Sequence, residues 1–431
     1  MMQEKRVVVT GIGPLTSIGI GKDSLWSALV EGKTNIKLEE WFVDGELWER
    51  FYLHKIDNFD IEKFNIDKNT LQEIKDWKDG EDIIDLYYLL AAVKLALEDS
   101  KLEYNPEDND IGCVVTHENA GLEQYISKCI DVSFAKIKKK SDPITKRQFS
   151  EKYHYATVKS AYDLQTFMVM FHILRTFKIH GYSLFVNNAC SSGLYALEVA
   201  SQIIKTGRSS AVIVASADYP RIYKYLWFKD LNMYAEDGRI KPFSKKSNGI
   251  VFGDGGCGLV MEDWEHAVKR KAKIYAEYLG GGFSQEGWKV IYPKVGDDFY
   301  QRAIREAIRF SKIDKKEIDL VCAHGVGNAV IDRYEAKAIT DIFGTNPKRP
   351  LVTTFKPYIG HNLGGSNLLE TAILLLCLES NLVLPVLNVE ETHPKMEMDV
   401  AKEKVKLELK TVLKICCAFA GYNAAVVFRK I

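Results

Sequence analysis

Residues 186–207 read VNNACSSGLYALEVASQIIKTG, and this stretch places a single cysteine, Cys190, between a short apolar segment and a helical pattern. Apolar residues recur at helical spacing after Cys190, and Gly207 is typical of the residue that follows a helix. A cysteine at such a strand-to-helix turn lies at the positive end of the helix dipole, which favours the nucleophilic thiolate. Most free cysteines are instead small buried hydrophobic residues. This stretch alone leaves both interpretations of Cys190 open.

Apolar, β-branched segments alternate with helical patterns on both sides of this stretch. RVVVTG and DSLWSALVEG precede it, and SAVIVASA follows it and ends at Ala217. The same alternation returns in the second half with DDFYQRAIREAIRFSK, IDLVCA, VIDRYEAKAITDIFG, LVTT and a long apolar helix that starts near Gly365. The alternation predicts parallel βαβ units in two related α/β halves, with the join near Trp264–Lys273.

Composition and charge exclude several function classes. The 431 residues are 46% apolar, and 58 basic side chains balance 58 acidic ones, so no broad field favours nucleic acid or an anionic membrane. The start, MMQEKRVVVTGIG, resembles neither a signal peptide nor a transit peptide, so we expect a cytoplasmic protein. LLETAILLLCLESNLVL contains Glu370 and Glu379 and is shorter than the roughly 20 apolar residues that a membrane span needs. It predicts a buried helix.

Two further features concern partners and metals. The eight cysteines show no Cys-x2-Cys spacing, so we expect reduced thiols and neither a zinc site nor a redox motif. The main charge run is KIKKKSDPITKR, Lys136 to Arg147. A solvated loop is its default interpretation, and a docking patch for an acidic partner is the alternative.

Two histidines and a lysine lie at other predicted strand-to-helix junctions. His324 follows a strand in VCAHGVGNAVIDRYEAK, and Lys356 and His361 lie five residues apart in the Gly-rich TTFKPYIGHNLGGSN. Loops at the carboxyl ends of parallel strands are where α/β proteins bind and react with ligands. A lone histidine there is more often a satisfied polar residue. Together with Cys190, these residues predict one active site.

These motifs resemble those of the thiolase-like condensing enzymes, in particular the β-ketoacyl carrier-protein synthases of the elongating synthase II type. The resemblance covers nearly the whole chain and rests on six segments in the family's order: VVVTGIGPLTSIG, ACSSG, KPFSKKSNGIVFGDGGCGLVMEDWEHAVKRKAKIYAE, HGVGNAVIDRYEAKAI, KPYIGHNLGGSN and AFAGYNAAVVF. It implies an α/β, thiolase-like fold in which two pseudo-repeated αβαβα halves form a five-layered core. The expected halves are residues 1–268, with the nucleophile and inserted dimer and pocket segments, and residues 269–431, with the histidines, the lysine and a gate loop.

The resemblance also implies roles for individual residues. Cys190 would be the acyl-accepting nucleophile, His324 and His361 the paired active-site histidines, and Lys356 the lysine of the site. Glu335 matches the carboxylate expected to pair with that lysine. A further match, Phe419, is expected to gate the site and to share the oxyanion hole with Cys190 through its backbone N–H.

The implied reaction is a decarboxylative Claisen condensation of an acyl group on Cys190 with malonyl-ACP, which gives a 3-oxoacyl-ACP. No metal or redox cofactor is expected. Both substrates would be bound as thioesters to the phosphopantetheine of an acyl carrier protein. The resemblance implies a homodimer across SLFVNNA, and a heterodimer with a related subunit stays open. Two other functions remain as alternatives: a non-catalytic partner of the chain-length-factor type, which would lack the cysteine, and an acyl transferase or thioester hydrolase.

The sequence departs from the family's pattern at several positions. Val326 and Asn328 replace two threonines that would hold the pantetheine arm, and the second can still donate or accept a hydrogen bond. An alanine, Ala420, stands in the gate loop where glycine is usual, which predicts a stiffer gate. Glu118 and Asn119 replace small or apolar residues that would line the acyl pocket. They predict a specialised fatty-acid or type II polyketide-like pathway unless these side chains point elsewhere.

Overall fold

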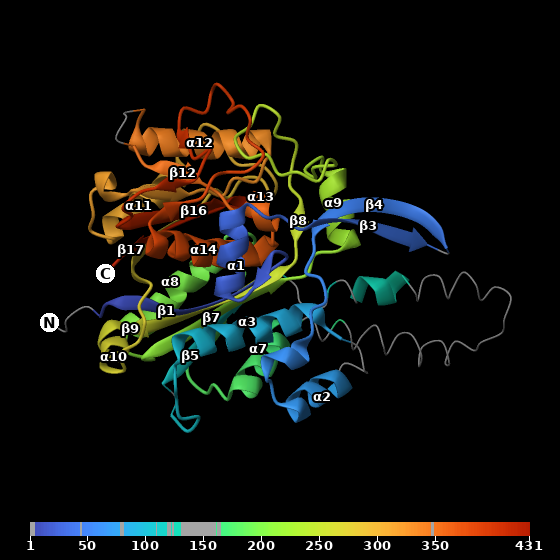
Figure 1. Cartoon of the computed structure of the whole chain (residues 1–431), viewed down its shortest axis with the longest axis vertical. Coiled ribbons are helices and arrows are strands. Elements are labelled where there is room, and N and C mark those ends of the chain that lie inside the picture. The colour runs from blue at the N-terminus through green and yellow to red at the C-terminus, as the bar shows by residue number, and fades with distance from the viewer. Residues whose placement is uncertain are drawn as a thin grey trace.

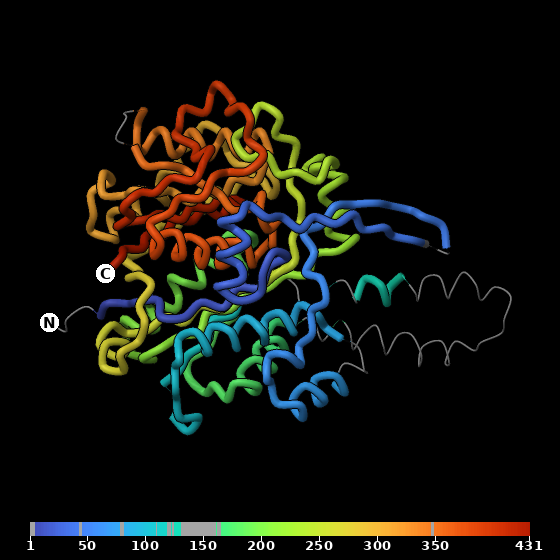
Figure 2. Tube along the Cα trace, in the orientation of Figure 1, coloured from blue at the N-terminus to red at the C-terminus, as the bar shows by residue number. Residues whose placement is uncertain are grey.

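The computed structural model describes residues 5–43, 45–77, 82–108, 110–118, 122, 125–130, 161, 165–345 and 349–431. Figure 1 shows two sets of strands with helices between them and on both outer faces. The tube in Figure 2 shows that the N- and C-terminal halves of the chain lie largely side by side. The hairpin of β3 (Ile36–Val43) and β4 (Glu46–His54) extends away from this body.

The strands of the N-terminal half are paired in a defined sequence of orientations. Their order across the sheet is β1 (Val7–Thr16), β9 (Gly255–Asp263), β7 (Ala211–Asp218), β5 (Ile111–Thr116) and β6 (Ser183–Phe185). The first two pairings in this order are antiparallel and the last two are parallel. Every residue of β7 and β5 is buried, as expected for strands covered on both faces.

The C-terminal half repeats this pattern. Its order is β10 (Ala276–Gln285), β17 (Tyr422–Arg429), β16 (Thr411–Cys417), β11 (Leu320–Cys322) and β12 (Leu351–Thr353), followed by β14 (Asp399–Val400). Two antiparallel pairings are again followed by parallel ones. β1 joins β10 in antiparallel register, with Val7 opposite Tyr278, so the two halves form one continuous sheet path. The prediction of two related α/β halves is confirmed.

Helices complete the layers. α8 (Ser192–Lys205) and α14 (Ser366–Ser380) contact each other and strands of both halves, so they form the middle layer. α3 (Ile84–Ser100) and α7 (Thr166–Phe177) cover the outer face of the N-terminal half. α11 (Phe299–Phe310) and α12 (Ala329–Phe343) cover the outer face of the C-terminal half. These layers agree with the predicted five-layered core, and the division at residues 268 and 269 stays a prediction.

Shorter elements connect the layers and shape the site. They are β2 (Gly19–Ile20), α1 (Lys22–Glu31), α2 (Lys68–Trp77), α9 (Ile222–Asp230), β8 (Phe252–Gly253), α10 (Trp264–Lys269), α13 (Lys356–Ile359), β13 (Leu382–Val383) and β15 (Val405–Lys406). Of these, α13 begins at the predicted catalytic residue Lys356, and α9 carries Phe228, which lines a cavity together with Cys190.

The long apolar helix lies in the middle of the protein. The span Leu363–Ser380 is long and apolar enough to cross a membrane, with a mean hydropathy of 1.2, but 89% of it is buried inside the fold. Leu374 and Leu375 belong to the central core, which also takes Leu194 and Leu197 of α8. A helix that is apolar on all sides is what a middle layer requires. The prediction of a buried helix for this segment is confirmed.

Candidate active site

Cys190 lies in a tight turn directly before α8. Ala189 adopts a left-handed φ of 51°, which is uncommon for alanine. The Ser192 hydroxyl stabilises the turn with two hydrogen bonds. It accepts from the N–H of Asn188 at 2.7 Å and donates to the carbonyl of Ala189 at 2.5 Å. Asn367 at the start of α14 donates its side-chain amide to the Cys190 carbonyl. These contacts fix the direction in which the sulfur points.

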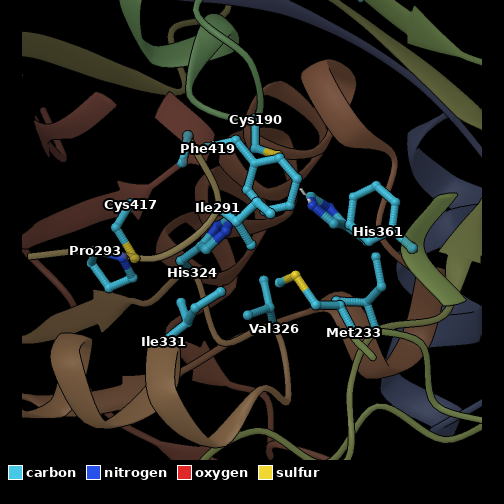
Figure 3. A pocket seen from close by; sticks show the side chains of 13 residues that line it. Cys190, Met233, Ile291, Pro293, His324, Val326, Ile331, His361, Cys417 and Phe419 are labelled. Carbon is cyan, nitrogen blue, oxygen red and sulfur yellow. Dashed lines mark hydrogen bonds between the residues drawn. The ribbon is translucent and has the colours of Figure 1, made fainter. Parts of the chain in front are cut away.

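His361 lies next to the sulfur of Cys190. Its Nε2 is 3.3 Å from Cys190 Sγ (Figure 3), and its Nδ1 is 2.7 Å from Ser366 Oγ. The backbone of His361 is bonded on both sides, since its N–H donates to Val251 and its carbonyl accepts from Gly253. A hydroxyl can donate or accept a hydrogen bond, so Ser366 is compatible with either neutral tautomer of His361.

His324 lies across the site from His361, and their ring centroids are 5.7 Å apart at 84°. The backbone N–H of His324 donates to Glu335 Oε1 at 2.7 Å, and its Nδ1 is 3.4 Å from Cys416 Sγ. The structure therefore brings both histidines to a cysteine that lies more than 130 residues before them in the sequence, as the motifs predict.

The predicted pairing of Lys356 with Glu335 is wrong. Lys356 Nζ donates to both carboxylate oxygens of Glu370, at 2.9 and 2.8 Å, and to the carbonyl of His324 at 2.7 Å. Glu335 instead accepts from the N–H groups of His324 and Gly325 and from the Tyr300 hydroxyl. Glu335 thus shapes the histidine loop, while Glu370 holds the lysine.

A second lysine, which the sequence analysis missed, shares the same carboxylate. Lys414 Nζ lies 2.9 Å from Glu370 Oε2, and Lys356, Lys414 and Glu370 are all 0% exposed. A signal for both residues was present in the sequence, because TVLKICC is an apolar strand with one lysine and α14 is an apolar helix with one internal glutamate. Charged residues inside buried elements require partners of opposite charge, so the lysine of the strand and the glutamate of the helix are predicted to pair.

Burial sets the protonation states of the three central residues. It lowers the pKa of His324 and of His361 well below the usual range, and the positive charges of Lys356 and Lys414 lower both further. Both imidazoles are therefore neutral at pH 7. Burial also raises the pKa of the Cys190 thiol well above its usual value, and Glu118 adds to this, while Lys356 opposes it.

Burial therefore opposes the thiolate that a helix N-terminus favours at Cys190. A helix N-terminus contributes about 0.3–2 kcal/mol in favour of an anion, whereas full burial moves a pKa by up to about 3–5 units, or roughly 4–7 kcal/mol. The desolvation of the buried sulfur outweighs the helix end. Cys190 rests as a thiol and has to pass its proton to a base when it reacts, and His361 Nε2 is within reach.

The cavity beside these residues is small and mostly apolar. Its volume is about 20 Å³, enough for one water molecule. The sulfur of Cys190 and both imidazoles line it, together with Phe419 and other apolar side chains, among them Phe228, Met233, Ile250, Val326 and Ile331. Figure 3 shows the labelled side chains of this set, among them Cys190, His324, His361 and Phe419, directed toward the cavity.

The gate loop carries Phe419 over this cavity. The Phe419 ring stacks on Phe228 at a centroid distance of 5.3 Å and meets the edge of Trp227 at 5.9 Å. Ala420 has a left-handed φ of 59°, as expected at a position where glycine is usual. The N–H of Ala420 donates to the carbonyl of Val290 at 2.6 Å, which ties the loop in place. The predicted stiffness of this gate stays a prediction.

The structure places the other predicted binding residues in different surroundings. Val326 lines the cavity, but the side-chain oxygen of Asn328 caps α12 by accepting from the N–H groups of Val330 and Ile331 at 3.0 and 3.3 Å. Only the Asn328 amide N–H group is left to bind an arm. Glu118 forms an ion pair with Lys224 on α9. Asn119 and the segment 136–147 lie outside the described residues.

None of the eight cysteines, all of which lie in the described residues, forms a disulfide bond. In the part of the chain that the structure describes, no group of three or more His, Cys, Asp or Glu side chains is arranged to hold a metal ion.

Comparisons with known proteins place this geometry in a family. The model of the beta-ketoacyl synthase N-terminal domain matches residues 4–267, and that of its C-terminal domain matches residues 275–390. The chain belongs to the β-ketoacyl synthase family. This ketosynthase is 25% identical, over all of both chains, to 3-oxoacyl-[acyl-carrier-protein] synthase 2 of Coxiella burnetii. The name of that relative describes an acyltransferase that forms C–C bonds, and this ketosynthase is a condensing enzyme of the same kind.

Solved structures agree with the thiolase-like fold. The ishigamide ketosynthase/chain length factor matches the ketosynthase with a TM-score of 0.85 at 23% identity, and both chains are fully covered. A type II polyketide ketosynthase, solved bound to a hexaketide and in complex with its acyl-carrier protein, matches with a TM-score of 0.83 at 22% identity over all of both chains. The predicted thiolase-like fold is confirmed.

Proposed function

We propose that this ketosynthase joins an acyl group, held as a thioester of Cys190, to a malonyl thioester carried by an acyl carrier protein. The products are a 3-oxoacyl thioester and CO2. The observation that carries the proposal is the contact of 3.3 Å between Cys190 Sγ and His361 Nε2. A second neutral imidazole, that of His324, has its ring centroid 5.7 Å from the centroid of His361. A hydrolase needs one base, whereas an enolate needs more than one donor.

In the first half-reaction, Cys190 attacks the carbonyl of the acyl thioester. Its proton moves to His361 Nε2, and the departing carrier thiolate takes that proton as the C–S bond breaks. Ser366 stabilises the imidazolium through Nδ1. The N–H groups of Cys190 and Phe419 are the proposed oxyanion donors, and one such donor contributes about 3–4 kcal/mol in comparable sites.

In the second half-reaction, malonyl thioester loses CO2, and negative charge develops on its carbonyl oxygen. Neutral His324 and His361 donate Nε2–H bonds to that oxygen, which is possible because burial and two lysines keep both rings unprotonated. The carbanion then attacks the acyl carbonyl, and the Cys190 thiolate leaves and is reprotonated. The steps use no metal and no redox cofactor.

One labelling experiment separates this function from its alternatives. The protein is incubated with radiolabelled acyl thioester, with and without malonyl-ACP. We expect label on the protein that is released as 3-oxoacyl product only when malonyl-ACP is added. Release as free acid would identify a hydrolase, and absence of labelling would identify a non-catalytic partner of the chain-length-factor type. Either result overturns the proposal.

The proposed assembly uses one edge of the sheet. Among the described residues β6 is the terminal strand of its half, and Leu184 on it is exposed, as are Phe167 and Phe171 on the neighbouring α7. Unpaired strand edges with apolar neighbours favour pairing with another chain. We propose a cytoplasmic homodimer through this edge that binds an acyl carrier protein, with a related subunit as the alternative partner. Sedimentation of the protein alone distinguishes the two assemblies.

The surroundings of Cys190 restrict the acyl group. Glu118 and Lys224 form an ion pair in which each side chain is less than one fifth exposed. A Cβ added to Gly364 would lie 3.4 Å from Asp218 Oδ2, 3.6 Å from Glu118 N and 3.8 Å from Ala189 O. These polar groups therefore converge beside the nucleophile turn. Burying an apolar chain against them would leave charges poorly solvated, so we propose a short or polar acyl group.

Acyl transfer to Cys190 should follow this restriction. We expect long saturated acyl thioesters to react at least about tenfold more slowly than short or hydroxylated ones, since charges have to be desolvated to admit an apolar chain. The double variant Glu118→Leu, Lys224→Met should remove the preference, because apolar side chains can replace an ion pair without large cost. A wild-type enzyme that transfers long saturated chains fastest would contradict the assignment.

Phe419 should control access to the sulfur. Phe419→Ala removes the ring that stacks on Phe228, so we expect iodoacetamide to alkylate Cys190 at least about tenfold faster, as reaction of a buried thiol is limited by access. Phe310→Ala, which removes an exposed ring on α11, is the control and should leave the rate unchanged. Equal alkylation rates in the wild type and in Phe419→Ala would show that Phe419 is no gate.

A further inference from the structure

Lys414 makes an unusually complete set of contacts for a buried charge. It is the only charged residue of β16, and it is 0% exposed. Its Nζ contacts Glu370 Oε2 at 2.9 Å, the Ala323 carbonyl at 3.1 Å and the Ile415 carbonyl at 3.2 Å. An ammonium group has three N–H donors, and these contacts use all of them. Such a lysine is charged in the folded protein.

The stability of the fold gives no reason for this second lysine. Taking an ammonium group out of water costs several kcal/mol, and replacing a buried ion by an apolar side chain is often neutral or stabilising. Glu370 already has a full partner in Lys356, which contacts both of its oxygens. Lys414 therefore adds a second positive charge to a carboxylate that one lysine would neutralise.

The two lysines hold consecutive carbonyl groups of the segment that carries His324. Lys414 donates to the carbonyl of Ala323, Lys356 donates to the carbonyl of His324, and Glu370 bridges the two ammonium groups. The position of the His324 ring is thereby coupled to both charges. Removing Lys414 would leave the Ala323 carbonyl without this donor and would leave Lys356 as the one ammonium group bound to Glu370.

We infer that Lys414 is a positioning residue of the malonyl half-reaction: it fixes the His324 segment and supplies a second buried positive charge beside the two histidines, which favours the enolate. This inference rests on the proposed function. Lys414 itself touches none of the described cavity-lining atoms, so its influence passes through Glu370 and Ala323.

The other groups that face the histidines fit this assignment. Around His324 these are His361, Cys416 and Glu335, with Lys356 and Glu370 behind the carbonyl of the same loop. Burial raises the pKa of Cys416 to about 12, so it is an uncharged thiol at neutral pH. Cys190 and Ser366 face His361. Lys356 and Lys414 are therefore the positive charges that act on both rings.

The test is the pH dependence of malonyl-ACP decarboxylation in Lys414→Met. The pKa of each histidine lies below its ordinary value, so loss of a positive charge raises it and protonates the rings at higher pH. We expect the acid limb of the rate profile to move up by about one pH unit and the plateau rate to fall about tenfold. Acyl transfer to Cys190 should fall less, because that step needs no enolate.

Two variants control for charge and for folding. Lys414→Arg keeps the charge and should return the acid limb toward the wild-type position. Lys410→Met removes a lysine of the same segment that is 70% exposed, and it should leave the profile unchanged. Thermal denaturation of each variant verifies folding, and Lys414→Gln replaces Lys414→Met if the latter does not fold.

Each result decides the inference. An acid limb at the wild-type position in a folded neutral variant would overturn it, because a purely structural lysine would not move the profile. Failure of both neutral variants to fold, while Lys414→Arg folds, would assign Lys414 to stability and also overturn it. A wild-type protein without decarboxylase activity would instead overturn the proposed function, which is a separate outcome.

Discussion

Cys190→Ala abolishes condensation and leaves malonyl decarboxylation measurable. Without the sulfur there is no acyl-enzyme, and loss of a catalytic nucleophile costs at least about 10⁴-fold in rate in comparable sites. In the proposed mechanism decarboxylation depends on His324 and His361, whose other contacts, with Cys416 and Ser366, are untouched by the change. The measurement compares release of CO2 from malonyl-ACP with formation of 3-oxoacyl product in the same sample.

The matched control is Cys113→Ala, which removes a buried thiol from β5 and should keep both activities. Condensation that survives in Cys190→Ala would place the nucleophile elsewhere. Loss of decarboxylation together with condensation would show that the two imidazoles do not suffice for the enolate.

Glu370→Gln should destabilise the protein by about 3–5 kcal/mol, since removing one member of a buried ionic group leaves an uncompensated charge. In this case two ammonium groups, those of Lys356 and Lys414, would lose their shared carboxylate, and none of the three side chains is exposed to solvent. Chemical denaturation at pH 7 measures the effect as a lower midpoint. The double variant Glu370→Gln, Lys414→Met should recover part of the loss, because one of the two unpaired charges is gone.

Glu379→Gln on the same helix is the control. Glu379 is exposed and pairs with Lys273 at the surface, so its replacement should change stability by no more than about 0.5 kcal/mol. If Glu370→Gln denatures at the same midpoint as Glu379→Gln, the buried triad is not held by charge.

The sequence was sufficient to predict that the cysteine and the two histidines lie together. Cys190, His324 and His361 each follow a predicted strand, and parallel strands deliver their carboxyl ends to one edge of a sheet. The alternation of strands and helices likewise predicted two halves. It predicted parallel units throughout, whereas the first two pairings in each half are antiparallel and only the later ones are parallel. The shared site and the two halves could be predicted because they depend on the local order of strands and helices along the sequence.

The partners of those residues could not be predicted in the same way. Glu335 is eleven residues from His324 and was expected to pair with Lys356, yet its carboxylate is taken by two backbone N–H groups and a tyrosine. Which carboxylate reaches the lysine depends on how α14 packs between the strands of the two halves. That is a property of tertiary packing, and the only local sign was a glutamate inside an apolar helix.

Protonation states also depend on packing. The position of Cys190 before a helix favours a thiolate, but the depth of burial, which the sequence does not show, outweighs it. A competing interaction also decides what Asn328 can bind. Its side-chain oxygen already accepts the N–H groups at the start of α12 and is not available to a substrate. In both cases a correct local rule was overridden by a stronger nonlocal or competing interaction.

The most direct test of the account asks which sulfur receives the acyl group. Cys416 contacts His324 and Cys417 lines the same cavity as Cys190, so three thiols lie near the site. The protein is incubated with an acyl thioester, digested and examined by peptide mass spectrometry before and after addition of malonyl-ACP. The account predicts an acyl mass on the peptide that contains Cys190, which disappears as 3-oxoacyl product forms. An acyl mass on the peptide that contains Cys416 and Cys417, or one that persists after malonyl-ACP is added, would contradict it.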